Sequence, residues 1–509
     1  MGLDGSTPSL LRQTELFTDA HPARAARQSA RENMSKELET GPRPPIETPT
    51  RREEFAGLTR LATPVVIAEL GWMGMGVVDT AMVGQVSPIA MGAVAVGSNI
   101  FFLFMGGGLG FLFGLDTVVS QAIGAGRIGE AHRSLIQGLI LAFGSSLFLT
   151  GCMFASAWNL DLVGIPDEVL PDARSYLWIT ALSMPALSVF TALRRYLQAM
   201  NLVRAFMVVV LAANVLNALV NWVLVFGNWG APAMEADGSA WATVISRAFM
   251  MLALGTYTLV HARRKNTGLL QTPLRLDKPL LARITRIGLP AGGQFLLETG
   301  FFNIAALLAA RLGPLPLAAH QVAITVAAFS FMTPLGISSA AAVRVGQAVG
   351  RGDAAGARLA GRTALVSGGV LMIGFAMAFF TLGREIAELF TTDPEVISIA
   401  ARIFAVAGAF QLFDGVQVIA VGALRGLGET RIPVIIGALA YWVVGISLAT
   451  TLAFHLELGV LGLWYGFVVA LAVAAAALLV VWNRQAKDPL QHRFGGSTGA
   501  ALDPGHSGG

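Results

Sequence analysis

The chain has 509 residues, of which 54% are hydrophobic and 13% charged, and its mean hydropathy is +0.65. Soluble domains carry about 25% charged residues, so this composition argues against a soluble protein and predicts a chain that mostly faces lipid. The net charge of +4 comes from basic residues in short segments between apolar runs, which is not the pattern of a nucleic-acid-binding protein. The single cysteine, Cys152, excludes an internal disulfide and a cysteine metal site.

Residues 1–58 are polar and rich in Arg, Glu, Pro and Ser, without helical periodicity. This segment is predicted to be a disordered cytosolic extension, and it has no pattern typical of a cleaved signal peptide. Residues 485–509, rich in Gly and Ser, are predicted to form a second disordered cytosolic tail.

Between these ends, apolar stretches of about 20 residues predict twelve transmembrane helices. A first lobe of six helices covers residues 59–261, a basic linker covers 262–285, and a second six-helix lobe covers 286–484. The expected spans are 59–83, 90–118, 134–157, 173–193, 205–227, 239–261, 286–310, 317–342, 363–383, 397–423, 432–454 and 459–483.

Lys and Arg gather in alternate connections between the spans, and the remaining connections are acidic. This one-sided bias predicts that both termini are cytosolic. Six is an even number, so both lobes have the same orientation. The expected fold is therefore an all-α integral membrane protein with two parallel six-helix lobes, related by a pseudo-twofold axis along the membrane normal.

An internal duplication supports this arrangement. Gln121-Ala-Ile-Gly-Ala-Gly126 returns as Gln347-Ala-Val-Gly-Arg-Gly352, and the segment Leu197–Arg204 lines up with Leu424–Arg431. The spacing between the copies is 226 to 227 residues. Duplicated halves around a central cavity are typical of secondary transporters, which move substrates by rocking of one half against the other.

Five acidic residues lie within or near the ends of the spans: Glu69, Asp79, Asp116, Glu298 and Asp414. An ionised carboxylate in mid-membrane costs at least about 2.5–3.5 kcal/mol, and we expect no Lys or Arg at comparable depth. These groups should then hold a proton, bind a cation or face water, as a cation-coupled transporter requires. The alternative is a protonated carboxyl that only ties helices together, which is favoured for Asp116 and stays open for Glu69.

Amide side chains add to the polar content of the spans. Asn214, Asn217 and Asn221 share one face of the fifth span, and Thr243 in the sixth could join them. Such amides either link helices or offer carbonyl oxygens to a hard cation. The tenth span has a similar polar face, formed by Gln411, Asp414 and Gln417.

Several segments together resemble the multidrug and toxic compound extrusion (MATE) family, in its NorM-like branch. They are Met75–Gly84, Gln121–Arg127, Arg344–Gly350 and Asp414–Gly426. The resemblance covers about residues 55–485. It implies a twelve-helix, two-lobe fold in the plasma membrane (the bacterial inner membrane) that exports cationic or amphipathic compounds in exchange for Na⁺ or H⁺.

Residue by residue, the resemblance assigns cation or proton coupling to Asp79, Glu298 and Asp414, with Na⁺ placed at the last two if sodium is the coupling ion. It also implies a supporting polar and cation site formed by Asn217, Asn221 and Thr243, with Phe331 as an aromatic contact of the cation. Glu69 departs from the family pattern, which has Gln there, and adds an extra titratable group.

The leading prediction is a monomeric multidrug antiporter and not an enzyme. Its expected partners are small cationic drugs or dyes and membrane lipid, without nucleic acid and without a cofactor besides the coupling ion. The alternative is a lipid-linked precursor flippase of the same superfamily. Such flippases tend to have extra helices and a strongly basic central cavity, whereas here we expect twelve spans and acidic cavity residues.

Overall fold

The computed structural model describes residues 48–490; the disorder predicted for 1–47 and 491–509 lies outside this range. Eleven of the described helices are long and apolar enough to cross a membrane. The helices Leu170–Ala181 and Met184–Ala199, bent by 44° at their junction, pass the same test together and supply a twelfth span. This confirms the predicted all-α membrane fold.

The first half contains α2 to α9, joined by short connections. Its helices are α2 Arg51–Val83, α3 Pro88–Leu109, η1 Gly110–Leu112, α4 Phe113–Gly124, α5 Ile128–Trp158, η2 Leu160–Val163, α6 Leu170–Ala181, α7 Met184–Ala199, α8 Val203–Leu224, η3 Asn228–Gly230 and α9 Glu235–Lys265. The elements α3, η1 and α4 form one span.

The second half contains α10 to α16, reached through the short helix η4 Leu269–Gln271. Its elements are α10 Lys278–Arg311, α11 Pro314–Arg351, α12 Ala354–Glu388, α13 Pro394–Leu427, α14 Arg431–Gly437, η5 Ala438–Gly445, α15 Ile446–Thr450, η6 Thr451–His455 and α16 Gly459–Gln485. The elements from α14 to η6 form one span, in which η5 and η6 are π-helical.

Helix ends are set by local capping. Thr50 forms a capping box with Glu53 and starts α2 at Arg51, so the last eight residues of the segment predicted to be disordered are helical. Asp277 caps α10, and its side chain accepts from the Leu280 N–H. The connection between the halves therefore covers only 266–277, because α9 and α10 extend into the predicted 262–285 linker.

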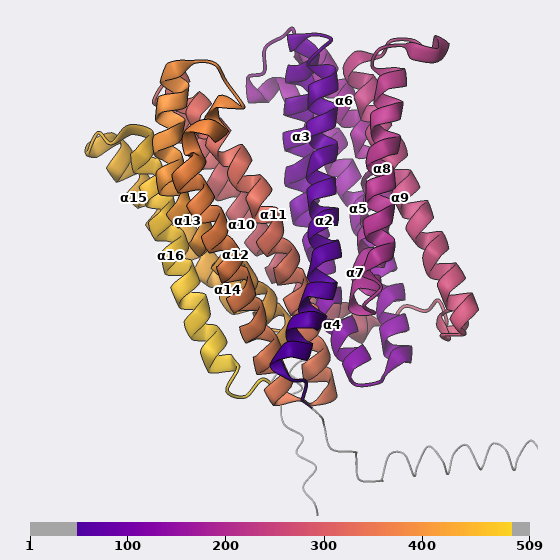
Figure 1. Cartoon of the computed structure of the whole chain (residues 1–509). Coiled ribbons are helices and arrows are strands. Elements are labelled where there is room, and N and C mark those ends of the chain that lie inside the picture. Colours follow the sequence, from indigo (N-terminus) through magenta and orange to yellow (C-terminus); the bar gives the residue numbers. More distant parts are fainter. Residues whose placement is uncertain (1–47, 491–509) are drawn as a thin grey trace, which may run out of the picture. The chain divides into compact units, whose positions relative to one another are not determined.

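Figure 1 shows α10–α16, in orange to yellow, beside α2–α9, in indigo to magenta. The connections and adjoining helix ends at one end of the bundle carry Arg and Lys, including Arg127, Lys265 and Arg275; this is the end where α2 begins, and we name it the basic end. Hydrogen bonds and ion pairs between the halves gather toward it, for example between Arg344 and Glu54 (2.9 Å).

The two halves meet along a reciprocal seam. A side chain at Gly124 would collide with the backbone of Gln347, and one at Gly350 would collide with the backbone of Gln121. The duplication offset of 226 residues relates Gly124 to Gly350 and Gln121 to Gln347. The repeated motif thus packs against its own copy, and glycine allows the two backbones to approach closely.

Candidate functional site: a central cavity and its acids

A cavity of about 460 Å³ lies between the two halves. Its lining comes from helices of both halves and is mostly apolar and aromatic, which suits a binding site for amphipathic molecules. The charged and amide side chains among its lining residues are Glu69, Arg194, Arg195, Gln294, Glu298, Asn303, Asp414, Gln417 and Arg425. Phe331, predicted as an aromatic contact of the cation, also lines it.

Glu298 and Asp414 face the same cavity from α10 and α13, and the structure brings them together through Gln417. The Gln417 Nε2 donates to Glu298 Oε1 at 3.0 Å and to Asp414 Oδ1 at 3.4 Å. In the described part of the chain, neither carboxylate forms an ion pair with a basic side chain. The pair is therefore held by a neutral donor and remains open to a cation.

Asp79 has a different environment. It is 6% exposed and is not among the cavity-lining residues. Asn221 Nδ2 donates to its Oδ1 at 2.6 Å, and the Thr243 hydroxyl donates to its Oδ2 at 3.1 Å. Asn217 is fully buried on the same face of α8, whereas the Asn214 amide donates to the Val210 carbonyl one turn earlier in that helix.

Glu69 corrects the expectation that no basic residue lies at comparable depth. It forms an ion pair with Arg194 of α7, and both residues line the cavity. The Arg194 guanidinium also lies 5.0 Å from the ring centroid of Phe206. The span expected from the sequence ends at residue 193 and leaves Arg194 in a loop, whereas α7 continues to Ala199.

A second correction concerns Asp116, which is completely buried. Its Oδ2 accepts from Arg195 at 3.0 Å and lies 3.5 Å from Arg425 Nε, so it links the first half to the second. Both guanidiniums pack over the Phe113 ring, at 4.4 and 4.7 Å from its centroid. We name Phe113, Asp116, Arg195 and Arg425 the floor cluster, because it lies on the side of the basic end and all of its residues except Asp116 line the cavity. The cavity is thus not lined by acids alone.

Sequence reasoning also missed Tyr441, whose hydroxyl donates to Gln417 Oε1 at 3.0 Å. The spacing along the tenth span predicts that Gln417 lies on the face of Asp414, and the two side chains are hydrogen-bonded in the structure. No sequence signal indicates a partner on the eleventh span. Gln411 lies on the same helix and turns away, toward Ala327 O at 3.5 Å.

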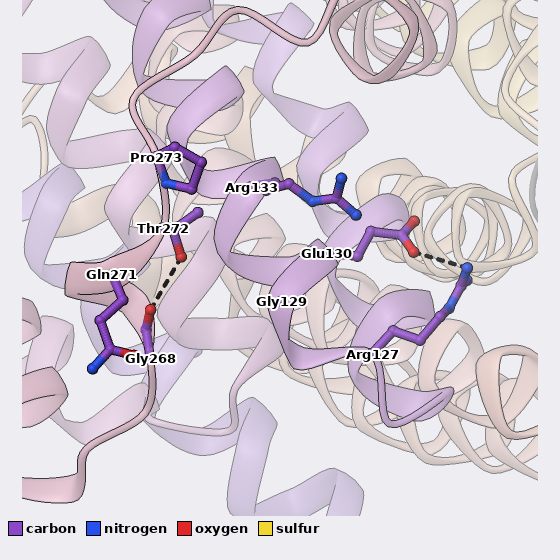
Figure 2. A pocket seen from close by; sticks show the side chains of 8 residues that line it. All are labelled: Arg127, Gly129, Glu130, Arg133, Gly268, Gln271, Thr272 and Pro273. Carbon is purple, nitrogen blue, oxygen red and sulfur yellow. Dashed lines mark hydrogen bonds and ion pairs between the residues drawn. The ribbon is translucent and has the colours of Figure 1, made fainter. Parts of the chain in front are cut away.

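A separate pocket of about 590 Å³ opens at the basic end, between the start of α5 and the connection that carries η4. Figure 2 shows the Arg127–Glu130 ion pair (2.8 Å) and the bond from the Thr272 hydroxyl to Gly268 O (3.1 Å) in its wall. Arg133, 53% exposed, lies on the same wall. This pocket shares no lining residue with the central cavity.

No group of three or more His, Cys, Asp or Glu residues that could hold a metal ion occurs within residues 48–490. Glu298 and Asp414 thus offer two carboxylates in the cavity lining, the type of oxygen ligand that hard cations prefer.

Comparison with known proteins gives matches over nearly all of the described helices. The MatE family model matches residues 64–223 and 290–451, one segment in each half. The multidrug resistance protein NorM of Vibrio parahaemolyticus is 34% identical over 450 residues, which cover 87% of this chain and 98% of that protein. A probable multidrug resistance protein NorM of Mesorhizobium japonicum is 33% identical, with 85% and 94% covered.

The fold is also similar to that of solved structures. The crystal structure of the eukaryotic MATE transporter AtDTX14 superposes with a TM-score of 0.78 at 22% identity, covering 87% of this chain and 99% of that one. At 22% identity, this similarity is evidence for a shared fold alone.

Proposed function

Because this chain belongs to the multidrug and toxic compound extrusion (MATE) family, we propose that it is a secondary active efflux transporter that exchanges cationic, amphipathic compounds for Na⁺ or H⁺. The family assignment rests on matches in both halves, and its curated bacterial relatives are named multidrug resistance proteins. The coupling ion and the charge of the cargo are our inference from the cavity.

The observation that carries the proposal is the acid pair. Glu298 and Asp414 line an apolar cavity, and in the described residues no basic side chain neutralises them by an ion pair. Such carboxylates attract an organic cation when ionised, and they lose that attraction when protonated or bound to Na⁺. Drug and coupling ion should therefore compete for the same negative charge.

The direction of transport follows from the basic end. Positive residues favour the cytosolic side, so we place the basic end, where α2 begins and α16 ends, in the cytosol and the chain in the bacterial inner membrane. The contacts across the seam and in the floor cluster separate the cavity from that side. This supports assigning the conformation to the outward-facing state of a rocking cycle.

In this cycle, Asp79, Glu298 and Asp414 would release the drug on the outside when they take up a proton or Na⁺. Rocking would then break the Asp116–Arg425 contact, because the two residues belong to different halves. Loss of the coupling ion to the cytosol restores the negative charge, which attracts the next cation. The ion drives the change only by binding the two states with different affinity.

The flippase alternative would require a strongly basic cavity. Three arginines do line the cavity, but Arg194 is paired with Glu69, and Arg195 and Arg425 share Asp116. With the acid pair and the buried Asp116 included, four carboxylates accompany these three guanidiniums, and of these groups Glu298 and Asp414 form no ion pair in the described residues. This balance favours cationic cargo over an anionic lipid-linked precursor.

The test is equilibrium binding of ethidium to the purified protein across a pH series and a Na⁺ series. Affinity should fall as pH drops, because protonation neutralises the acid pair, or as Na⁺ rises, because Na⁺ occupies it. The matched control is Glu388→Gln, which removes an exposed carboxylate of the same half that pairs with Arg384. It should bind as the wild type does. Flat affinity in both series contradicts the coupling proposed here.

A further inference from the structure

We propose that Gln417 and Tyr441 act together as a positioning clamp that holds Glu298 and Asp414 ionised and ready for a cation. The inference rests on the proposed function, because it explains how the same acid pair is kept available. Neither residue is proposed as a ligand of the drug or of the coupling ion.

The clamp is built from one amide and one hydroxyl, both buried. Gln417 and Tyr441 are each 0% exposed. The two N–H bonds of the Gln417 Nε2 point to different carboxylates, at 3.0 Å from Glu298 and 3.4 Å from Asp414. A single neutral group therefore donates to both acids, which supports the ionised form of each.

Tyr441 decides which end of the amide faces the acids. A side-chain amide can turn by half a rotation and present its oxygen in place of its nitrogen, and the hydrogen-bond partners determine the choice. The Tyr441 hydroxyl donates to Gln417 Oε1 at 3.0 Å. This bond occupies the amide oxygen on the far side and leaves the N–H groups directed at Glu298 and Asp414.

Tyr441 is itself fixed in place by packing. Its ring stacks on Phe301, with centroids 5.4 Å apart and an interplanar angle of 21°. Phe301 lies on α10, three residues after Glu298, so the same helix positions the acid and the ring that supports the clamp. Tyr441 belongs to the π-helical segment η5, and such wide turns often occur at functional sites because they reorient a side chain.

The other charged groups that line the cavity have partners of their own. Of those lining the cavity, Glu69 pairs with Arg194, and Arg195 and Arg425 pair with Asp116. The elements packed around the pair carry their remaining titratable groups mostly near their ends: Lys278, Arg283, Arg286 and Arg311 on α10, His320, Arg344 and Arg351 on α11, Arg358, Arg362, Arg384, Glu385 and Glu388 on α12, Glu395 and Arg402 on α13, Arg431 on α14, His455 on η6, and Tyr465 and Arg484 on α16.

The experiment measures ethidium binding to the purified full-length protein as a function of pH. Gln417→Leu removes both donors, so the carboxylates take up protons at higher pH than in the wild type. We expect the midpoint of dye release to move upward by about one pH unit, since a hydrogen bond to a charged group contributes about as much free energy as a shift of one pKa unit. Tyr441→Phe removes only the orienting hydroxyl and should shift the midpoint in the same direction by less.

Two further variants separate positioning from packing. Gln411→Leu changes a buried glutamine of the same helix that bonds Ala327 O, so its midpoint should stay at the wild-type value. In the double variant Gln417→Leu/Tyr441→Phe, the midpoint should equal that of Gln417→Leu alone, because Tyr441 acts only through the amide.

The outcomes are distinct. A wild-type protein whose dye binding ignores both pH and Na⁺ contradicts the proposed function. A wild-type transition that stays in place in Gln417→Leu and in Tyr441→Phe contradicts the clamp alone. If Na⁺ no longer competes with the dye in Gln417→Leu while the pH midpoint is unchanged, Gln417 is a ligand of Na⁺. This result also contradicts the clamp. Should Gln417→Leu fail to fold, the milder Tyr441→Phe still gives the deciding midpoint.

Discussion

The two halves of the molecule hold their buried acids in contrasting ways. In the second half, Glu298 and Asp414 face the central cavity and share one amide donor. In the first half, Asp79 lies away from the cavity lining and is enclosed by Asn221 and Thr243. The first arrangement is accessible to a large cation, whereas the second suits a proton or a small ion.

The contrast is sharper because the scaffold is duplicated. At the offset of 226 to 227 residues, the counterparts of Glu298 and Asp414 are Trp72 and Leu187, which also line the cavity. The counterpart of Asp79 is Ala305. Each acid therefore corresponds to an apolar residue at the equivalent position of the other half, so the halves share their helix packing but differ in chemistry.

The largest effect should come from neutralising the acid pair. Glu298→Gln and Asp414→Asn keep the shape and remove the charge, so each should lower dye efflux from cells at least about a hundredfold, or about 2.8 kcal/mol. Expression should stay near normal, because a neutral amide costs less in lipid than an ion. Glu388→Gln serves as the exposed control. If both variants export dye at the wild-type rate, the pair only packs helices.

Asp79→Asn should separate transport from binding. The site lies outside the cavity lining, so ethidium should bind at neutral pH with nearly wild-type affinity. Efflux should fall by about tenfold, or about 1.4 kcal/mol, because an amide cannot take up and release a proton. Measuring both quantities on one preparation tests this. Equal losses of dye affinity in Asp79→Asn and Glu298→Gln would show that the two acids act as one site.

The smallest effect is expected for Glu69, whose ion pair lies at the cavity wall. Glu69→Gln should reduce stability by about 1 kcal/mol, since partly solvated ion pairs contribute little. Thermal unfolding in detergent measures this loss. The double variant Glu69→Gln/Arg194→Gln should recover part of it, because no guanidinium is then left unpaired. A loss of efflux as large as that of Glu298→Gln would instead give Glu69 a coupling role.

Hydropathy and duplication predicted the spans and the acids, but not the arginines that pair with them. The apolar stretches locate the hydrocarbon core, whereas the helices run on past it: α7 ends at Ala199 and α13 at Leu427, beyond the expected 193 and 423. Arg194 and Arg425 therefore looked like loop residues. The hydrogen bond between Tyr441 and Gln417 joins two spans, and Tyr441 lies in a π-helical segment. Residue spacing in the sequence predicts neither the contact between spans nor the π-helix.

The seam between the two halves has the pairing pattern of a self-complementary interface. In a twofold dimer, residue i of one subunit contacts residue j of the other, and j contacts i in return. Gly124 with Gln347 and Gly350 with Gln121 follow this rule within one chain, and so do Gly110 with Gly292 and Gly336 with Val66. The chain thus has the internal geometry of a homodimer whose subunits were fused. In a fused chain, each half can change its polar residues independently. The glycines at the contact are constrained in both halves, because a side chain there would collide with the other half.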